Sequence, residues 1–387
     1  MNPTQRQFFG GLGSLRGFAV LMVVLYHVDW PNPVTGHRLF QNGYLMVDLC
    51  FVLSGFVICH NYVPKIRTGN DVLPFMILRF GRLYPLHLFF LLLFLGLEIV
   101  KYFAERKYGF VAQQSRAFTR NNASAFIANL LLVQPFSRAA NKTFNAPSWN
   151  VGVQFYCYLV FAVVVLIFRR RRGLSLAAAL LAALSALLLI GFGHEGLTAT
   201  AGLNFLRCLT GFFTGVVAHK IYAACQASVA RWSTKLAWCL VAFLVAFLSL
   251  KQDSRLDYVV IPAFAVLIIA LAAMPAGSGG TISRILNSVP IRWLGKISYS
   301  IYMCQLLVLI FMTRAFALAQ RKLVPGTHRA LWDFALGLGS VLLAVASVLV
   351  VAFFTQRWIE ATCQNGFRSW VARRFTTNVA GPARVTT

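Results

Sequence analysis

The sequence has few charged residues, and very few of these are acidic. Only 12% of its 387 residues are Asp, Glu, Lys or Arg, and just 10 are Asp or Glu. Soluble domains carry about 25% charged residues, so this chain lacks the polar surface that water requires. Because 58% of its residues are hydrophobic, the composition excludes an ordinary soluble globular protein and indicates an integral membrane protein.

The eight cysteines show no pattern of pairing. They lie singly, most of them within apolar runs, and no two have the spacing of metal ligands or of a secreted disulfide framework. We predict small buried side chains and no metal site. The first apolar run ends in His27, Asp29 and Trp30 rather than in the small residues of a cleavage site, so we expect it to stay as a membrane span.

The formal net charge is +26, which in a soluble protein would suggest a nucleic-acid partner. Here the basic residues lie mainly between apolar runs, as do the four arginines 169–172. The positive-inside rule explains such a distribution, and contact with membrane-lipid phosphates is a second explanation. We predict no binding to nucleic acid.

The apolar runs predict an all-α, polytopic bundle of about ten transmembrane helices, because about 20 residues cross a ~30 Å hydrocarbon core. We expect one membrane domain over residues 1–360 and a basic, flexible tail over 361–387. Shorter amphipathic helices are predicted near 122–134 and 281–290, and the polar connection 105–149 could cover the mouth of a cavity. Lys and Arg are more frequent on the side of the N-terminus, which predicts an inner-membrane protein with both termini in the cytoplasm. The predicted spans are 14–30, 43–62, 83–104, 150–168, 173–191, 200–222, 235–250, 257–274, 297–319 and 331–356.

Two ionisable residues are predicted at similar depth in the first two spans. His27 lies near the outer end of the first span and Asp48 about one turn inside the second. A carboxylate beside an imidazole fixes its tautomer and raises its basicity, which suits general-base catalysis. A buried polar pair that only joins two helices is the equally open alternative.

Arg79 and Arg82 stand at the cytoplasmic end of the third span, three residues apart and therefore on one helical face. Two guanidinium groups that face one way suit a phosphate-bearing ligand. The positive-inside rule or lipid headgroups would explain them without a ligand. Arg207 lies within the sixth span, where it could face the same ligand cavity or pair with a carboxylate.

These features together resemble the acyltransferase-3 family of membrane acyltransferases. The motifs in this sequence are LRGFA followed by His27, VDLCFVLSG with Asp48, RFGR with Arg79 and Arg82, WNVGVQFYCY at 149–158 and ISYSIY at 297–302. They occur in the family's order over residues 12–360. The resemblance implies transfer of an acyl group, often acetyl, from acyl-CoA to a hydroxyl of a sugar, polysaccharide or lipid-linked glycan.

The same resemblance implies a role for each of these polar residues. His27 would be catalytic with Asp48 as its partner, and Arg79 and Arg82 would belong to the CoA site. Trp149, Tyr158, Tyr299 and Tyr302 could line an acceptor pocket, although aromatic residues at span ends are usually interfacial anchors.

Two positions depart from the family pattern. Gln154 stands where the family usually has Glu, and Gln305 stands where it usually has His. A Gln keeps the hydrogen bonds of Glu but cannot ionise, so a catalytically silent member is one alternative. A transporter or lipid-handling protein is another, although we find no inverted repeat to support it.

Overall fold

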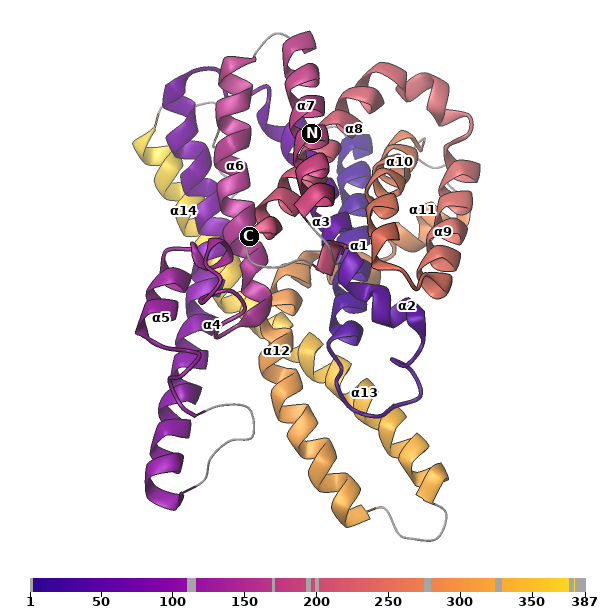
Figure 1. The fold of residues 1–387 in the computed structure, drawn as a ribbon. Helices are drawn as coiled ribbons and strands as arrows, with labels where there is room; N and C mark the ends of the chain where they lie inside the picture. Colours follow the sequence, from indigo (N-terminus) through magenta and orange to yellow (C-terminus); the bar gives the residue numbers. More distant parts are fainter. Residues whose placement is uncertain are drawn as a thin grey trace.

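The computed structural model describes residues 3–109, 116–168, 171–192, 196–198, 202–274, 280–323, 329–375 and 379. Within these ranges the secondary structure is helical, with no strand. The α-helices (Figure 1) are α1 (Pro3–Tyr26), α2 (Arg38–Gln41), α3 (Met46–Tyr62), α4 (Val72–Tyr108), α5 (Ala123–Leu130), α6 (Trp149–Ile167), α7 (Arg171–Phe192), α8 (Leu203–Ala230), α9 (Ser233–Leu250), α10 (Val260–Ala273), α11 (Gly280–Asn287), α12 (Val289–Leu323), α13 (Arg329–Thr355) and α14 (Ala361–Arg374).

The predicted helical membrane bundle is confirmed. Among the described residues, nine helices are long and apolar enough to cross a membrane, and Gly11–Tyr26 is a shorter apolar helix. Each of the ten predicted spans coincides with one of these helices, and the two predicted amphipathic segments correspond to α5 and α11. Two boundaries differ in ways that matter for the site: α4 is 37 residues long, and α1 ends at Tyr26, so His27 lies just beyond the helix.

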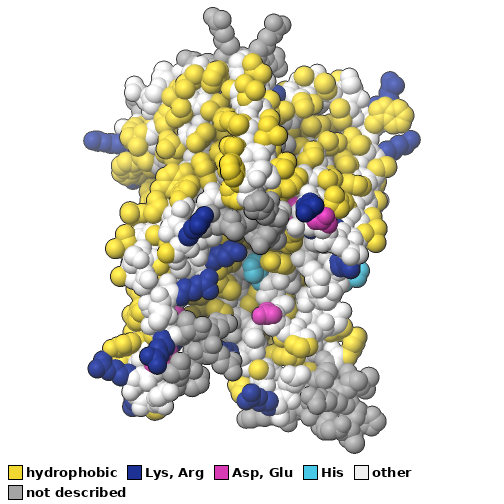
Figure 2. Space-filling model, in the orientation of Figure 1, with side chains coloured by type: hydrophobic (Ala, Val, Ile, Leu, Met, Phe, Trp, Pro, Cys, Tyr) yellow, Lys and Arg dark blue, Asp and Glu magenta, His cyan; other side chains and the backbone are white. Residues whose placement is uncertain are grey.

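The outer surface of the bundle is apolar, as a lipid environment requires. On α7, Leu176, Leu180, Leu184 and Leu187 are between 56% and 67% exposed, and their spacing of three or four residues gives α7 an apolar face that no other helix covers. Figure 2 shows hydrophobic side chains over most of the upper half of one face. Soluble monomers rarely expose apolar patches of this extent, so these side chains face lipid.

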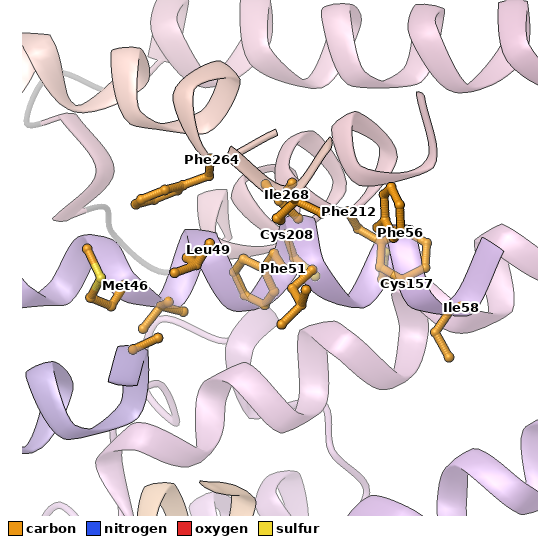
Figure 3. Close-up of a cluster of buried hydrophobic side chains, with 14 of the residues drawn as sticks. Met46, Leu49, Phe51, Phe56, Ile58, Cys157, Cys208, Phe212, Phe264 and Ile268 are labelled. Carbon is orange, nitrogen blue, oxygen red and sulfur yellow. The ribbon is translucent and has the colours of Figure 1, made fainter. Parts of the chain in front are cut away.

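The most buried helix is α3, and its packing against α8 is unusually close. A Cβ atom added to Gly55 would lie 1.8 Å from the Phe212 carbonyl oxygen, and one added to Gly215 would lie 2.0 Å from that of Val52. Helices in membranes approach one another through such small residues. Around this contact, side chains of α3, α6, α8 and α10 form the cluster of Figure 3, which includes Phe51 and Cys208.

Part of the segment predicted as a basic, flexible tail is helical. A single π-helical turn, Gln356–Glu360, follows α13 and leads into α14 (Ala361–Arg374). The Phe367 side chain of α14 packs where a Cβ on Gly81 of α4 would lie, with its Cβ, Cγ and Cδ2 atoms 2.5–2.7 Å from that position. This contact joins α14 to α4, because Gly81 leaves the space that the Phe367 side chain fills.

Candidate active site

Two cavities enter the helix bundle, and the residues that the sequence singled out are divided between them. The first, called the arginine cavity below, is lined by Arg16, Val20, Val23, Val47, Cys50, Ser54, Val57, Ile58, Arg79, Arg82, Leu83, Asn150, Val151, Gln154, Tyr158, Ser298, Tyr299 and Tyr302. The second, the histidine cavity, is lined by Val23, Tyr26, His27, Tyr44, Val47, Lys142, Ala146, Pro147, Trp149, Asn204, Arg207 and Tyr302.

The two cavities share three lining residues, and this shared wall is called the junction below. Val23 of α1, Val47 of α3 and Tyr302 of α12 line both of them. The Tyr302 hydroxyl donates a hydrogen bond of 2.8 Å to the Pro147 carbonyl oxygen, which holds the ring at the junction. A ligand in the arginine cavity and a ligand in the histidine cavity would therefore approach each other between these three side chains.

His27 has a defined tautomer, set by the end of its own helix. Its Nδ1 lies 2.8 Å from the Val23 carbonyl oxygen. A carbonyl can only accept, so Nδ1 carries the hydrogen and Nε2 carries the lone pair. The same Val23 carbonyl oxygen also accepts a longer hydrogen bond of 3.3 Å from the His27 backbone N–H, which its two lone pairs allow. Thus the Val23 carbonyl oxygen orients the His27 imidazole, which is the role that the sequence suggested for Asp48.

The environment of His27 favours its neutral form. Burial lowers the pKa of His27, the hydrogen bond to Val23 raises it, and the charge of Lys142 lowers it, with a net shift below the ordinary value. At neutral pH the Nε2 lone pair is then free to accept a proton, which a general base requires.

Asp48 forms an ion pair with Arg207, for which a carboxylate partner was one of the predicted alternatives, and no direct hydrogen bond joins Asp48 to His27 among the described residues. Its Oδ2 lies 2.6 Å from Arg207 Nη2, and its Oδ1 accepts from Arg207 Nε at 2.9 Å. The Asp48 side chain is fully buried and that of Arg207 is 5% exposed. This bidentate geometry occupies both carboxylate oxygens. In this ion pair, which joins the facing helices α3 and α8, the charges of Asp48 and Arg207 balance each other. An imidazole would balance the buried carboxylate less well.

The Asp48–Arg207 pair belongs to a larger buried network that the sequence analysis missed. Arg207 also donates to the backbone carbonyls of Tyr44 and Leu197, and the Tyr44 hydroxyl lies 3.0 Å from both Asp257 carboxylate oxygens. Lys251 Nζ completes the network at 2.6 Å from Asp257. A charged residue inside an apolar span is the signal that pointed to Arg207, whereas Lys251 and Asp257 lie near helix ends, where charge is common.

The arginine cavity brings Arg79 and Arg82 together, as their spacing predicted, and adds Arg16 of α1. Arg82 forms an ion pair with Glu360. Arg79 donates to the Tyr62 hydroxyl, while its Nε is buried without a partner. No carboxylate forms an ion pair with Arg16 or Arg79 among the described residues. The cavity therefore holds positive charge that the described carboxylates do not neutralise, and it suits an anionic ligand.

The remaining predicted residues separate by cavity. Trp149 lines the histidine cavity, with its ring centroid 5.7 Å from the Arg207 guanidinium carbon. Gln154 and Tyr299 line the arginine cavity instead; Gln154 Nε2 donates to Ser54 Oγ at 2.9 Å. Gln305 lines neither, and both of its amide atoms are buried without a hydrogen bond.

Comparison with known proteins identifies the family of the chain. The sequence profile of a family described as "Acyltransferase domain" matches residues 9–355. O-acetyltransferase OatA of Staphylococcus aureus is 23% identical over 353 residues, which cover 81% of this chain and 53% of the relative. The putative peptidoglycan O-acetyltransferase YrhL of Bacillus subtilis is 23% identical over 405 residues, which cover 95% of this chain and 57% of the relative.

A third relative is more similar over a shorter region. Protein 2 in the picA locus of Rhizobium radiobacter is 38% identical over 106 residues, covering 26% of this chain and 52% of the relative. The chain spans about half the length of the curated relatives it matches. No solved structure matches. Because the family profile covers nearly the whole chain, from residue 9 to residue 355, the chain belongs to the acyltransferase-3 family of membrane acyltransferases.

Proposed function

We propose that this protein is a membrane O-acyltransferase that moves an acyl group, most simply acetyl, from acyl-CoA to a hydroxyl of a sugar, polysaccharide or lipid-linked glycan. The observation that carries the proposal is the junction of the two cavities at Val23, Val47 and Tyr302. It would let a donor on the arginine side meet an acceptor beside His27. The names of two relatives, O-acetyltransferase OatA and the putative peptidoglycan O-acetyltransferase YrhL, support an acetyl group, and the second name supports a glycan acceptor.

In this proposal the arginine cavity holds the phosphates of CoA. Arg79 and Arg16 supply positive charge without an ion-pair partner among the described residues, and the buried Arg79 Nε has a hydrogen to donate. Arg82, tied to Glu360, is held in place at the side of the same cavity. The pantetheine arm would then extend past Val47 and Tyr302 towards His27, so the thioester would reach the junction.

The proposed reaction is direct acyl transfer with His27 as the general base. His27 Nε2 takes the proton of the acceptor hydroxyl as its oxygen attacks the thioester carbonyl carbon. The new C–O bond forms, the C–S bond breaks, and the CoA thiolate leaves. The proton then passes from the imidazolium to the thiolate or to water, which restores neutral His27.

The proposal also sets an orientation. Acyl-CoA is made in the cytoplasm, so the arginine cavity would open on the cytoplasmic side and the histidine cavity on the opposite side of the inner membrane. Both chain termini would then be cytoplasmic, in agreement with the distribution of Lys and Arg.

The test is release of CoA from acetyl-CoA by purified protein in the presence of candidate glycans. We expect His27→Ala and His27→Gln to lower the rate about 10²–10⁴-fold, the usual contribution of a general base. The control is His37→Gln, because His37 lies on the loop before α2, outside both cavities.

The rate of wild-type protein should fall as the pH drops through the lowered pKa of His27, below 6.5, because the protonated base is inactive.

Three results would contradict the proposal. Normal transfer by both His27 variants would place the chemistry elsewhere. Acetyl-CoA binding without any transfer, unchanged when Gln154→Glu restores the usual family residue, would favour a catalytically silent member. Transport of an uncleaved solute would favour a transporter.

A further inference from the structure

Lys142 is a cation at the mouth of the histidine cavity that nothing in the proposed reaction uses. It lines the cavity together with His27, its side chain is exposed, and its backbone has a φ of +58°, a conformation that residues other than Gly rarely adopt. The next residues are buried and anchored: Phe144 N–H donates to the Asn121 side chain at 2.7 Å, and Asn145 donates to the Met303 carbonyl oxygen at 3.0 Å. These anchors fix the loop, so Lys142 is presented to the cavity.

Arg120 does not line the histidine cavity, but it contacts the Lys142 backbone and adds a second positive charge nearby. Its guanidinium donates to the Lys142 carbonyl oxygen at 3.1 Å. Neither residue forms an ion pair within the part of the chain that the structure describes. The carboxylates on the nearby part of α4 have other partners. Glu105 accepts from the backbone N–H of residue 117, and Glu98 accepts from that of residue 118 and also pairs with Lys101.

The acidic residue nearest to His27 in sequence does not neutralise these charges. Asp29 lines a separate cavity, together with Trp30 and Asn32. Figure 2 shows Lys and Arg side chains gathered beside a histidine on the lower half of one face, below the mainly hydrophobic upper half. In the proposed orientation this basic surface faces away from the cytoplasm, so the positive-inside rule does not account for it.

We infer that Lys142 and Arg120 form a binding site for an acidic group of the acceptor, and that the preferred acceptor is a carboxylated glycan. This inference rests on the proposed function, because it concerns the acceptor of the same reaction. The carboxylate would lie at Lys142 while a hydroxyl of the same or a neighbouring sugar lies at His27. An unpaired ammonium and guanidinium hold a carboxylate through charge-assisted hydrogen bonds, and clefts of one charge sign also concentrate oppositely charged ligands.

The position of Lys142 favours a glycan over a lipid headgroup. Lys142 lines the cavity that contains His27, Trp149 and Arg207, so its partner must enter that cavity. A headgroup of the surrounding bilayer would contact the outside of the bundle. The Trp149 ring at the same cavity offers an apolar face of the kind on which a sugar ring packs.

The experiment compares an oligosaccharide that carries uronic acid residues with its carboxyl-reduced, neutral counterpart. Binding is measured by calorimetry on His27→Gln protein in nanodiscs of neutral lipid, so that no turnover is needed. We expect tighter binding of the acidic form, weakened about tenfold or more by Lys142→Ala, the usual scale of one charge-assisted hydrogen bond. Lys142→Arg should retain the preference, and Arg106→Ala serves as a control, because Arg106 is an exposed cation on α4 that lines neither cavity.

Each outcome bears on the inference separately from the proposed function. Equal affinity for the two oligosaccharides, or equal weakening of both by Lys142→Ala, would overturn it even if His27 proves catalytic. An effect of Lys142→Ala that appears only in nanodiscs of anionic lipid would also overturn it, and would assign Lys142 to lipid. A carboxylate preference that depends on Lys142 would support it, even if the His27 variants retain transfer and the proposed general base is wrong.

Discussion

At the scale of single residues, the neighbours of His27 determine what it can do. The Val23 carbonyl oxygen holds Nδ1 and leaves Nε2 with the lone pair. Asp48, one helix away, balances the charge of Arg207. Both ionisable residues are conspicuous in the sequence because each lies in or next to an apolar run. Their proximity in the sequence suggested that Asp48 pairs with His27, whereas the structure pairs Asp48 with Arg207, a permanent cation on a helix distant in sequence.

This difference leads to a prediction about Asp48. Asp48→Asn should destabilise the protein by about 3–5 kcal/mol, because it leaves the Arg207 charge buried without a partner. Arg207→Gln should cost a similar amount, and the double variant should cost less than the sum of the two. Thermal unfolding in detergent measures these differences.

The catalytic readout separates this structural role from a direct one. Asp48→Asn protein that remains folded at low temperature should keep a pH profile with an acid limb like that of the wild type. A full loss of transfer at unchanged stability would show instead that the carboxylate acts on His27.

At the scale of the helices, the contact between α3 and α8 positions the site. Gly55, Gly211 and Gly215 let the two backbones approach closely, and this approach brings Asp48 within hydrogen-bond distance of Arg207. The Asp48–Arg207 ion pair therefore depends on glycines that lie one to two turns away on the same two helices.

Gly215→Ala should disrupt that contact. The added methyl group would lie 2.0 Å from the Val52 carbonyl oxygen, and backbone atoms cannot yield as a flexible side chain can. We expect a loss of about 1–3 kcal/mol of stability, the usual cost of overpacking, together with reduced transfer as Arg207 moves from Asp48.

Gly96→Ala on α4 is the matched control. Nothing lies within 4 Å of the position of its Cβ, so the change should be neutral or slightly stabilising, because Ala favours the helix by about 1 kcal/mol. Thermal unfolding and CoA release measured for both variants give the comparison, and equal behaviour of the two would argue against a positioning role for the α3–α8 contact.

At the scale of the whole molecule, the bundle separates two chemically different ends. Arg79 and Arg82 line one cavity, whereas His27 and Lys142 line the other. Val23, Val47 and Tyr302 line both cavities, and in the proposed function donor and acceptor would reach this junction from opposite sides.

This separation predicts a topology that can be measured directly. Single cysteines placed at Arg231, exposed between α8 and α9, and at Asp253, exposed between α9 and α10, should be labelled from opposite sides of the membrane, in a background that lacks the other exposed cysteines. A membrane-impermeant maleimide added to intact cells should label the cysteine at position 253 and not the one at position 231. The reverse pattern would invert the proposed orientation.

Much of the fold followed from the sequence because its causes are local. A run of about 20 apolar residues forms a helix in lipid whatever its neighbours are, since every backbone hydrogen bond must be made within the segment. The same local logic marked His27, Asp48 and Arg207, because an ionisable residue in such a run is costly and therefore conspicuous. The spacing of Arg79 and Arg82 placed them on one helical face. The order of the motifs then indicated the family.

The tertiary structure decided which of these residues meet. The Asp48–Arg207 pair, the Tyr44–Asp257 hydrogen bond and the packing of Phe367 on Gly81 join positions far apart in the sequence, and such partners depend on which helices pack together and how closely. The division of Trp149 from Gln154 and Tyr299 between the two cavities has the same origin. Apolar length and buried charge are properties of a single segment, whereas a cavity is formed by several helices and exists only after they have packed.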